Sequence, residues 1–147
     1  MRHAWPLAIL LLTAQPALAA FDETTPRPNL ALLKTQIESG RAGLAITPLN
    51  DWLIKKPNDT DALNLLGYAY RKLKRWDESR QHYERALKIE PAHIGALEYM
   101  GELELQTGNP DAARTLLIRL QKACPDGCHE LDDLLQAFKD HGQTTGG

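Results

Sequence analysis

The sequence is poor in the features that mark nucleic-acid-binding and membrane-surface proteins. Its 147 residues carry 17 Lys and Arg against 19 Asp and Glu, which gives a formal net charge of −2 at pH 7. A nucleic-acid-binding domain normally shows a basic patch or stripe that neutralises phosphates. A chain of this length supports one domain of ordinary size. We therefore expect a single domain without a nucleic-acid partner.

Catalytic motifs are scarce as well. The two serines, Ser39 and Ser79, lack a Gly-x-Ser-x-Gly context, and the chain has neither a His-Glu-x-x-His pair nor a glycine-rich phosphate loop. His82, His93 and His129 are scattered along the chain, which is typical of surface or capping histidines rather than of metal ligands. The sequence therefore predicts a protein that is not an enzyme and has no metal site and no cofactor.

Long apolar runs are also missing, with one short exception at the start. A basic start precedes an apolar stretch of about 12 residues, well below the roughly 20 needed to cross a bilayer. A proline and a small-x-small triplet follow, which is the pattern of a cleavable signal peptide. We expect residues 1–19 to be removed by cleavage after Ala19, leaving an irregular segment at residues 20–28 in a periplasmic or secreted protein. A retained membrane anchor is the alternative, and after cleavage no membrane span is expected.

What the chain does contain is an internal repeat, with a period of about 34 residues. The positions that recur at this interval are the prolines Pro57, Pro91 and Pro125, the glycines Gly67 and Gly101, the small residues Ala45, Ser79 and Ala113, and the large residues Leu49, Tyr83 and Leu117. Self-similarity at a fixed period is the signature of repeat architectures, whose units stack on one another. The sequence therefore predicts a stack of similar units about 34 residues long.

The unit at residues 60–93 carries the pattern most fully, with Leu63, Leu66, Gly67, Tyr70, Ser79, Tyr83, Ala86 and Pro91. These residues resemble the tetratricopeptide repeat, which has W, L, G, Y, A, F, A and P in the corresponding places. The resemblance implies an all-α fold, an antiparallel helix-hairpin solenoid of about three units with a C-terminal capping helix. It also implies that Gly67 faces Ser79 between the two helices and, one unit later, that Gly101 faces Ala113.

The unit at residues 94–127 keeps the spacing and departs at one place. The residues that fit are Leu97, Met100, Gly101, Ala113, Leu117, Leu120 and Pro125. Glu104 stands where the resemblance calls for an aromatic residue. In the turn between the two helices, Gly108 is expected to take the left-handed position that ends the first helix. Asn109 is then expected to cap the second helix, with Pro110 at its first position.

The two ends of the array are less regular. Residues 29–59 form a degenerate first unit, because Pro48 falls inside its second helix, where a proline costs about 3 kcal/mol. We therefore expect that helix to be shortened to about Pro48–Lys55. Residues 128–141 carry apolar residues at helical spacing and are predicted to be the helix that caps the array. The polar, glycine-ended tail at residues 142–147 is predicted to be disordered.

Only two cysteines occur, Cys124 and Cys128. Two close cysteines in an exported protein normally bond, and we expect a disulfide that pins the last repeat helix to the capping helix. It would stabilise the fold by roughly 2 kcal/mol on the chain-entropy estimate. One alternative is a redox dithiol, although three residues separate the cysteines rather than two. Another is covalent haem, because His129 follows Cys128 and Met100 or His141 could supply a second ligand.

The resemblance also implies a binding surface. In tetratricopeptide arrays the first helices of successive units line a concave groove, and repeat positions 2, 5, 9 and 12 point into it. The residues so implied are Asp61, Asn64, Tyr68, Arg71, Glu98 and Glu102, with Tyr99 beside them and Lys34 from the first unit. Two tyrosines, an asparagine and charges of both signs suit an extended or helical peptide with some basic character. The alternative is that these are solvated helix residues without a ligand.

These inferences lead to three hypotheses about function. The first is an exported protein–protein or peptide-binding module that acts as an adaptor or scaffold in the cell envelope. The second is a structural subunit that docks permanently into a larger envelope complex. The third, ranked below the others, is a c-type haem redox carrier through Cys124, Cys128 and His129.

Overall fold

The computed structural model describes residues 26–142, and these residues fold into seven α-helices joined by short turns. The helices are α1 (Leu30–Glu38), α2 (Gly43–Lys55), α3 (Thr60–Lys72), α4 (Trp76–Ile89), α5 (Ile94–Gln106), α6 (Pro110–Ala123) and α7 (His129–Asp140). The predicted signal peptide at residues 1–19, the start of the irregular segment and the tail from residue 143 lie outside the described residues.

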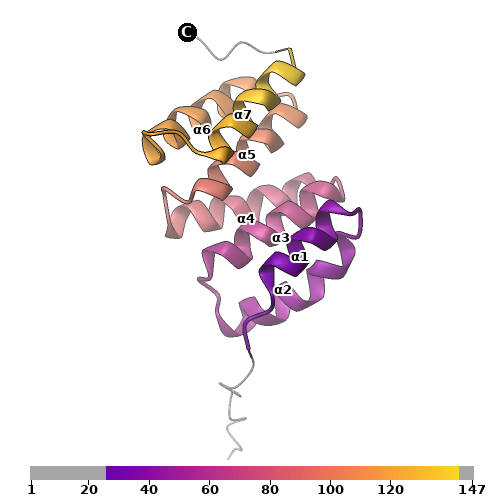
Figure 1. The fold of residues 1–147 in the computed structure, drawn as a ribbon. Coiled ribbons are helices and arrows are strands. Elements are labelled where there is room, and N and C mark those ends of the chain that lie inside the picture. The colour runs from indigo at the N-terminus through magenta and orange to yellow at the C-terminus, as the bar shows by residue number, and fades with distance from the viewer. Residues whose placement is uncertain (1–25, 143–147) are drawn as a thin grey trace, which may run out of the picture.

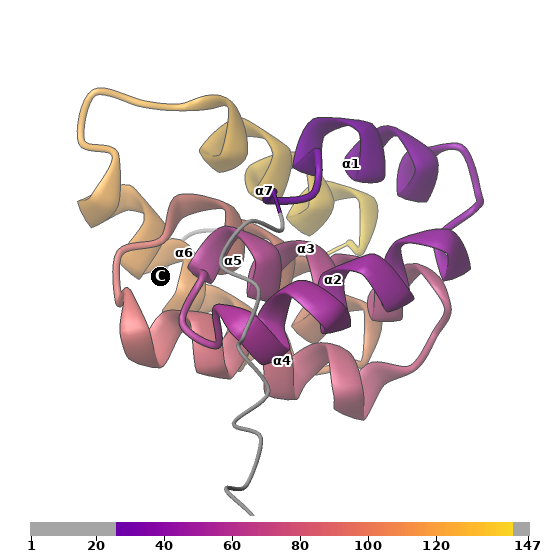
Figure 2. The same cartoon turned by 90° about the horizontal axis from the view of Figure 1, so that it is seen from below.

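The helices form two rows. In the inner row α1, α3, α5 and α7 contact one another in order, and in the outer row α2, α4 and α6 each pack between two helices of the inner row. The stack runs from α1 and α2 at one end to α5, α6 and α7 at the other (Figure 1). Seen along the stack, α1 and α7 lie on one side and α4 on the other (Figure 2). The predicted all-α helix-hairpin solenoid is confirmed.

The residue that ends each helix of the inner row recurs once per repeat period. Gly40, Lys74, Gly108 and Gly142 follow α1, α3, α5 and α7, and their φ angles are 82°, 58°, 82° and 65°. A residue in this left-handed region terminates a helix, and glycine adopts it without steric cost. Gly108 thus has its predicted conformation. The same turn after α7 shows that this helix stands in the place of the first helix of a further unit.

The small residues of the repeat lie between helices, but they meet different neighbours. In the unit 60–93, Ser79 Oγ donates a hydrogen bond of 2.8 Å to the Gly67 carbonyl oxygen, so these two residues face one another as predicted. A Cβ at Gly67 would lie 2.6 Å from Cε1 of Tyr83 in the same unit. A Cβ at Gly101 would lie 2.8 Å from the methyl groups of Leu134 on α7. The space beside Gly101 is therefore filled by the capping helix, a neighbour that the expected pairing with Ala113 did not include.

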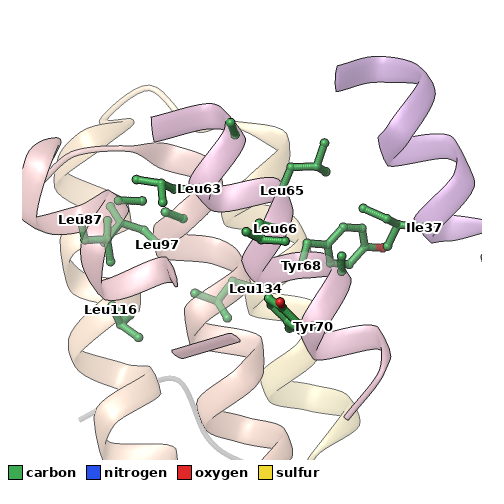
Figure 3. Close-up of a cluster of buried hydrophobic side chains, with 14 of the residues drawn as sticks. Ile37, Leu63, Leu65, Leu66, Tyr68, Tyr70, Leu87, Leu97, Leu116 and Leu134 are labelled. Atoms are coloured by element: carbon green, nitrogen blue, oxygen red, sulfur yellow. The ribbon is translucent and has the colours of Figure 1, made fainter. Parts of the chain in front are cut away.

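The apolar core runs the length of the stack between the two rows. It extends from Ile37 on α1 across the leucines of α3 to Leu134 on α7 (Figure 3). The predicted packing residues Ser79, Tyr83, Ala86 and Ala113 are fully buried. Tyr70 stacks on His82 with ring centroids 5.4 Å apart, whereas Pro91 is exposed in the turn after α4.

Helix α2 begins earlier than the sequence predicts. It starts at Gly43 and holds Pro48 in its interior, so the expected shortened helix Pro48–Lys55 is wrong. Pro48 lacks the N–H that would bond the Leu44 carbonyl one turn earlier. Leu44 is 58% exposed, so the proline lies one turn after an exposed part of the helix, which continues through it.

The turn between α5 and α6 also differs from the prediction in one respect. Asn109 occupies the N-cap position before Pro110, but its side chain makes no capping hydrogen bond. Its Nδ2 instead donates to Glu104 Oε2 at 3.0 Å. Glu104, in the aromatic position of the repeat, is buried and accepts from Arg80 Nε at 2.8 Å and Nη2 at 3.2 Å. A buried ionic cluster thus replaces the expected aromatic residue.

The two cysteines join α6 to α7. Cys124 follows the last residue of α6 and Cys128 precedes the first residue of α7. Their Cα atoms are 6.0 Å apart and their sulfurs are at bonding distance, within the range of protein disulfides. The pair therefore links the last hairpin to the helix that covers it.

Candidate functional site

The inner row lines a cavity of about 840 Å³. All eight residues that the sequence assigns to a groove line it, namely Lys34, Asp61, Asn64, Tyr68, Arg71, Glu98, Tyr99 and Glu102. They meet because stacking at a constant period places equivalent faces of successive helices side by side. The structure therefore brings the whole predicted set to one surface.

Four of these residues form a cluster between α3 and α5. The rings of Tyr68 and Tyr99 stack with centroids 4.5 Å apart. The Arg71 guanidinium lies 5.2 Å from the Tyr68 centroid and 5.5 Å from the Tyr99 centroid, and its Nη1 pairs with Glu102 Oε2. Arg71 is only 5% exposed, so two aromatic faces and one carboxylate hold its charge. Tyr68 and Arg71 are thus part of a preformed wall of the cavity.

Polar groups of α3 and α5 meet near the first turn of α5. His93 Nδ1 accepts a hydrogen bond of 3.1 Å from the Ala96 amide and so caps α5, while its Nε2 lies 3.2 Å from Asp61 Oδ1. In a neutral ring whose Nδ1 is an acceptor, Nε2 carries the proton and donates to Asp61. A Cβ at Gly95 would lie 2.8 Å from Asn64 Nδ2, so glycine at this position lets the two helices approach.

A network around Asp59 closes the cavity at the edge near α1. Arg27 Nη2 donates to Asp59 Oδ1 at 2.6 Å and to Asp61 Oδ2 at 2.9 Å. Asp59 also caps α3 through the Ala62 amide and accepts from Trp52 Nε1 at 2.8 Å. Burial works to raise the pKa of Asp59, but the hydrogen bonds from Arg27, Trp52 and the Ala62 amide outweigh it and hold the pKa below its usual value. The network ties the segment before α1 to the second unit.

Glu98 differs from the other acids of the cavity. It is 5% exposed, and within residues 26–142 its carboxyl group has no hydrogen-bond or ion-pair partner. Burial, reinforced by the negative charges of Glu102, Asp133 and Glu130, raises the pKa of Glu98 to about 8. At neutral pH this side chain is therefore mainly a neutral acid.

Helix α7 contributes cavity residues that the sequence interpretation missed. His129, Glu130 and Asp133 line the cavity beside α5, and none of the three is among the groove residues that the sequence assigns. The repeat spacing could have indicated these positions. His129 stands one repeat period after Gly95, and Asp133 stands one period after Tyr99. Extending the repeat register into the capping helix would have placed them on the inner face.

The charges of the cavity are unbalanced. Its acidic lining residues are Glu38, Asp61, Glu90, Glu98, Glu102, Glu130 and Asp133, and its permanently cationic ones are Arg27, Lys34 and Arg71. The cations are engaged locally: Arg27 with Asp59 and Asp61, Lys34 with Glu38, and Arg71 with Glu102. Acidic side chains therefore outnumber cationic ones in the lining of the cavity.

Comparison with known families identifies the middle unit. Residues 60–93, from the first residue of α3 to the cap of α5, match the profile of the tetratricopeptide repeat. The chain therefore carries a tetratricopeptide repeat. The flanking hairpins repeat its turns at the same interval, as expected for neighbours in a tetratricopeptide array. No curated protein matches the chain significantly.

The identification bears on the class of function. Tetratricopeptide repeats are protein–protein interaction modules, and the family is in general not catalytic. Between residues 26 and 142, no helix combines the length and the apolar character needed to cross a membrane. Residues of α1, α3, α5 and α7, the four helices of the inner row, line the cavity.

Proposed function

We propose that this protein is an exported tetratricopeptide module that binds an extended or helical segment of a partner protein, as an adaptor or scaffold in the cell envelope. The observation that carries the proposal is the meeting of all eight predicted groove residues in one cavity. The cavity combines stacked aromatic rings, polar groups and an excess of acidic side chains. Such a surface offers stacking and apolar area together with sites for basic side chains.

The proposed location rests on two features of the sequence. Residues 1–19 have the charge, apolar length and small-x-small end of a cleavable signal peptide. The only two cysteines pair with each other, and stable disulfides are typical of oxidising compartments. Mass spectrometry of the protein from its native host should show a mature chain that begins at Ala20. A chain that retains Met1 in the cytoplasm would contradict this location.

The binding surface can be tested by site-specific photo-crosslinking in the full chain. A crosslinking amino acid at Lys34 stands in the cavity, whereas the same substitution at Glu84 stands on an exposed position of α4 outside it. We expect the Lys34 position to give a discrete adduct and the Glu84 position to give none. Equal labelling from both positions, or labelling from Glu84 alone, would place the partner elsewhere and refute the groove.

One observation favours the structural-subunit alternative. The first hairpin exposes three large apolar side chains, those of Leu32, Leu44 and Ile54, with exposures of 54%, 58% and 71%. A permanent interface would cover such residues. Crosslinks from Ile54 to a stoichiometric partner that co-purifies in high salt would support a permanent subunit. A partner that crosslinks only through Lys34 and dissociates on dilution would support the adaptor.

The haem alternative requires both cysteine sulfurs for thioether bonds. In this structure the sulfurs of Cys124 and Cys128 are bonded to each other. The neighbouring His129 has a side chain that is 83% exposed, with its Nε2 3.3 Å from Asp133 Oδ2. Both features are explained by the link between α6 and α7, so the geometry favours the structural disulfide.

A further inference from the structure

The carboxyl group of Glu98 lies at the α5–α7 end of the cavity without a partner. Glu98 is the fifth residue of α5 and lines the cavity together with Glu130 and Asp133 of α7. It is 5% exposed, yet within residues 26–142 nothing donates a hydrogen bond to it or pairs with it. An acid buried in this way normally has a hydrogen-bond or ionic partner. Residues 26–142 therefore leave this acid without the partner that its burial calls for.

The neighbouring side chains explain why residues 26–142 supply no cationic partner to Glu98. Arg71 on α3 carries a positive charge that acts on Glu98. Its guanidinium, however, pairs with Glu102 and lies against the rings of Tyr68 and Tyr99. On α7, His129 pairs with Asp133, and Glu130 adds a further negative charge. These acids favour the neutral form of Glu98 in the free protein, and they add to the negative charge that a cationic ligand would meet.

The outer row does not supply a cation to Glu98 either. On α4, Arg80 forms its ion pair with Glu104 at the other end of α5. On α6, Arg119 donates to the Pro91 carbonyl oxygen at 2.9 Å. Both of these cations are thus committed to other acceptors.

We propose that Glu98 anchors a subsite for the guanidinium group of an arginine in the bound peptide, with Glu130 and Asp133 at its rim. This inference rests on the proposed function, since it names the side chain that the groove would recognise. A guanidinium group suits the site because it matches a carboxylate with two parallel hydrogen bonds and lies readily against aromatic rings. On binding, the carboxyl proton of Glu98 passes to water, and the guanidinium keeps all of its protons.

Proton release follows from the state of the free site. With a pKa of about 8, Glu98 holds about 0.9 of a proton at pH 7 in the free protein. A complex that requires the carboxylate releases this proton, so the affinity should rise about tenfold between pH 7 and pH 9. Arginine remains protonated across this range, so the pH dependence reports the protein and not the ligand.

The test uses two synthetic dodecapeptide libraries with the same randomised flanks and a fixed central residue. That residue is arginine in one library and citrulline, its uncharged analogue, in the other. Peptides retained by the oxidised full-length mature protein are identified, and their binding is measured by calorimetry in phosphate and in Tris buffers. The difference in heat between the buffers gives the number of protons released. Glu98→Gln removes the charge with almost no change of shape, and Glu84→Gln is the matched control outside the cavity.

We expect the arginine library to be retained at least tenfold better than the citrulline library, with release of about 0.9 of a proton at pH 7. Both effects should vanish in Glu98→Gln and persist in Glu84→Gln. If the two libraries bind equally well, the arginine subsite is wrong while the peptide groove stands. If neither library is retained, the groove and the subsite are both wrong. If arginine selectivity survives in Glu98→Gln, the cation binds at another acid and the assignment to Glu98 is overturned.

Discussion

The units at residues 60–93 and 94–127 share one period and one backbone course, but different interactions hold them together. In the first, the contacts around its packing glycine lie within the unit: Tyr83 covers Gly67, Ser79 binds the Gly67 carbonyl, and Tyr70 stacks on His82. The second relies on its neighbours. Leu134 of α7 covers Gly101, and Glu104 reaches Arg80 of the preceding unit.

This difference shows what a repeat period does and does not determine. The period fixes the helix ends and the inner row, which is why the cavity forms across all units. It does not fix which side chain fills each gap. Where the unit 94–127 lacks the aromatic residue of the pattern, Glu104 makes a contact with the preceding unit instead. We therefore expect the stability of this unit to depend more on the neighbouring helices. Four predictions test this dependence.

The largest expected loss of stability comes from adding a methyl group at the two glycines. Gly67→Ala should destabilise the protein by about 3 kcal/mol, because the added Cβ would meet the fully buried Tyr83 ring. Gly101→Ala should stay within about 1 kcal/mol of the parent protein, because flexible Leu134 methyl groups can move aside and alanine favours the helix. Urea unfolding of both variants measures the difference. Equal losses would show that the two glycines have equivalent environments.

Two buried acids of α5 should respond in opposite ways to neutralisation. Glu104→Gln should cost about 2 kcal/mol, because it weakens the pair with Arg80, which is partly exposed. Glu98→Gln should stabilise the protein at pH 8, because Glu98 has no partner for its charge within residues 26–142.

The stability difference between Glu98→Gln and the parent protein should depend on pH. Its folded pKa of about 8 lies above the ordinary value of 4.5. The stabilisation from the neutral form is therefore complete below about pH 4.5 and is lost as the pH rises to about 8, by at most about 1.4 kcal/mol per pH unit. Urea unfolding at pH 5, 6.5 and 8 should show Glu98→Gln gaining on the parent protein with each step. A constant difference would mean that Glu98 is already ionised in the folded state.

The disulfide should matter for the second unit more than for the first. Replacing Cys124 and Cys128 by serine should lower the unfolding free energy by about 2 kcal/mol. Hydrogen exchange should rise first in α6 and α7, because the link joins these two helices. Faster exchange spread evenly over α3 and α4 as well would show that the array unfolds as one unit and that the link has no local role.

The smallest effect concerns the two caps that stand one repeat period apart, Asp59 and His93. Asp59→Asn keeps a capping oxygen but loses the charge that Arg27 binds, so it should cost about 1 kcal/mol at pH 7. Because the pKa of Asp59 is lowered in the fold, its contribution is present above about pH 3.9 and is lost as the pH falls below that value. His93→Ala should cost a similar amount through the lost cap on α5. An acid unfolding limb unchanged in Asp59→Asn would contradict the role of the Arg27 pair.

Much of the fold could be predicted because the residues that recur at the repeat period are ones whose size or backbone freedom restricts the local structure. Glycine at Gly108 and the Gly67–Ser79 pair lead directly to the observed turn and hairpin. The start of α2 could not be predicted, because the cost of Pro48 depends on whether the freed carbonyl reaches water. The side-chain partner of Asn109 could not be predicted either, because Glu104 approaches Asn109 only in the folded turn.

The candidate site shows the same division. The positions of the groove residues follow from the repeat register, so all eight reach the cavity. Their chemical states do not follow from it. Arg71 pairs with Glu102 and lies against two rings, while Glu98 has no partner within residues 26–142. This difference depends on which helix faces each side chain. The contribution of α7 was missed because the register was not carried past Pro125.

The central claim is that a partner segment lies in the cavity of the inner row, and mapping the bound peptide by NMR tests it most directly. The mature, oxidised protein is titrated with a retained arginine peptide, and backbone and methyl shifts are followed for every helix. The account predicts shifts that concentrate on α1, α3, α5 and α7, with the Glu98 carboxyl carbon moving to its ionised value at pH 7. Shifts concentrated on α2, α4 and α6, with Glu98 unchanged, would contradict it.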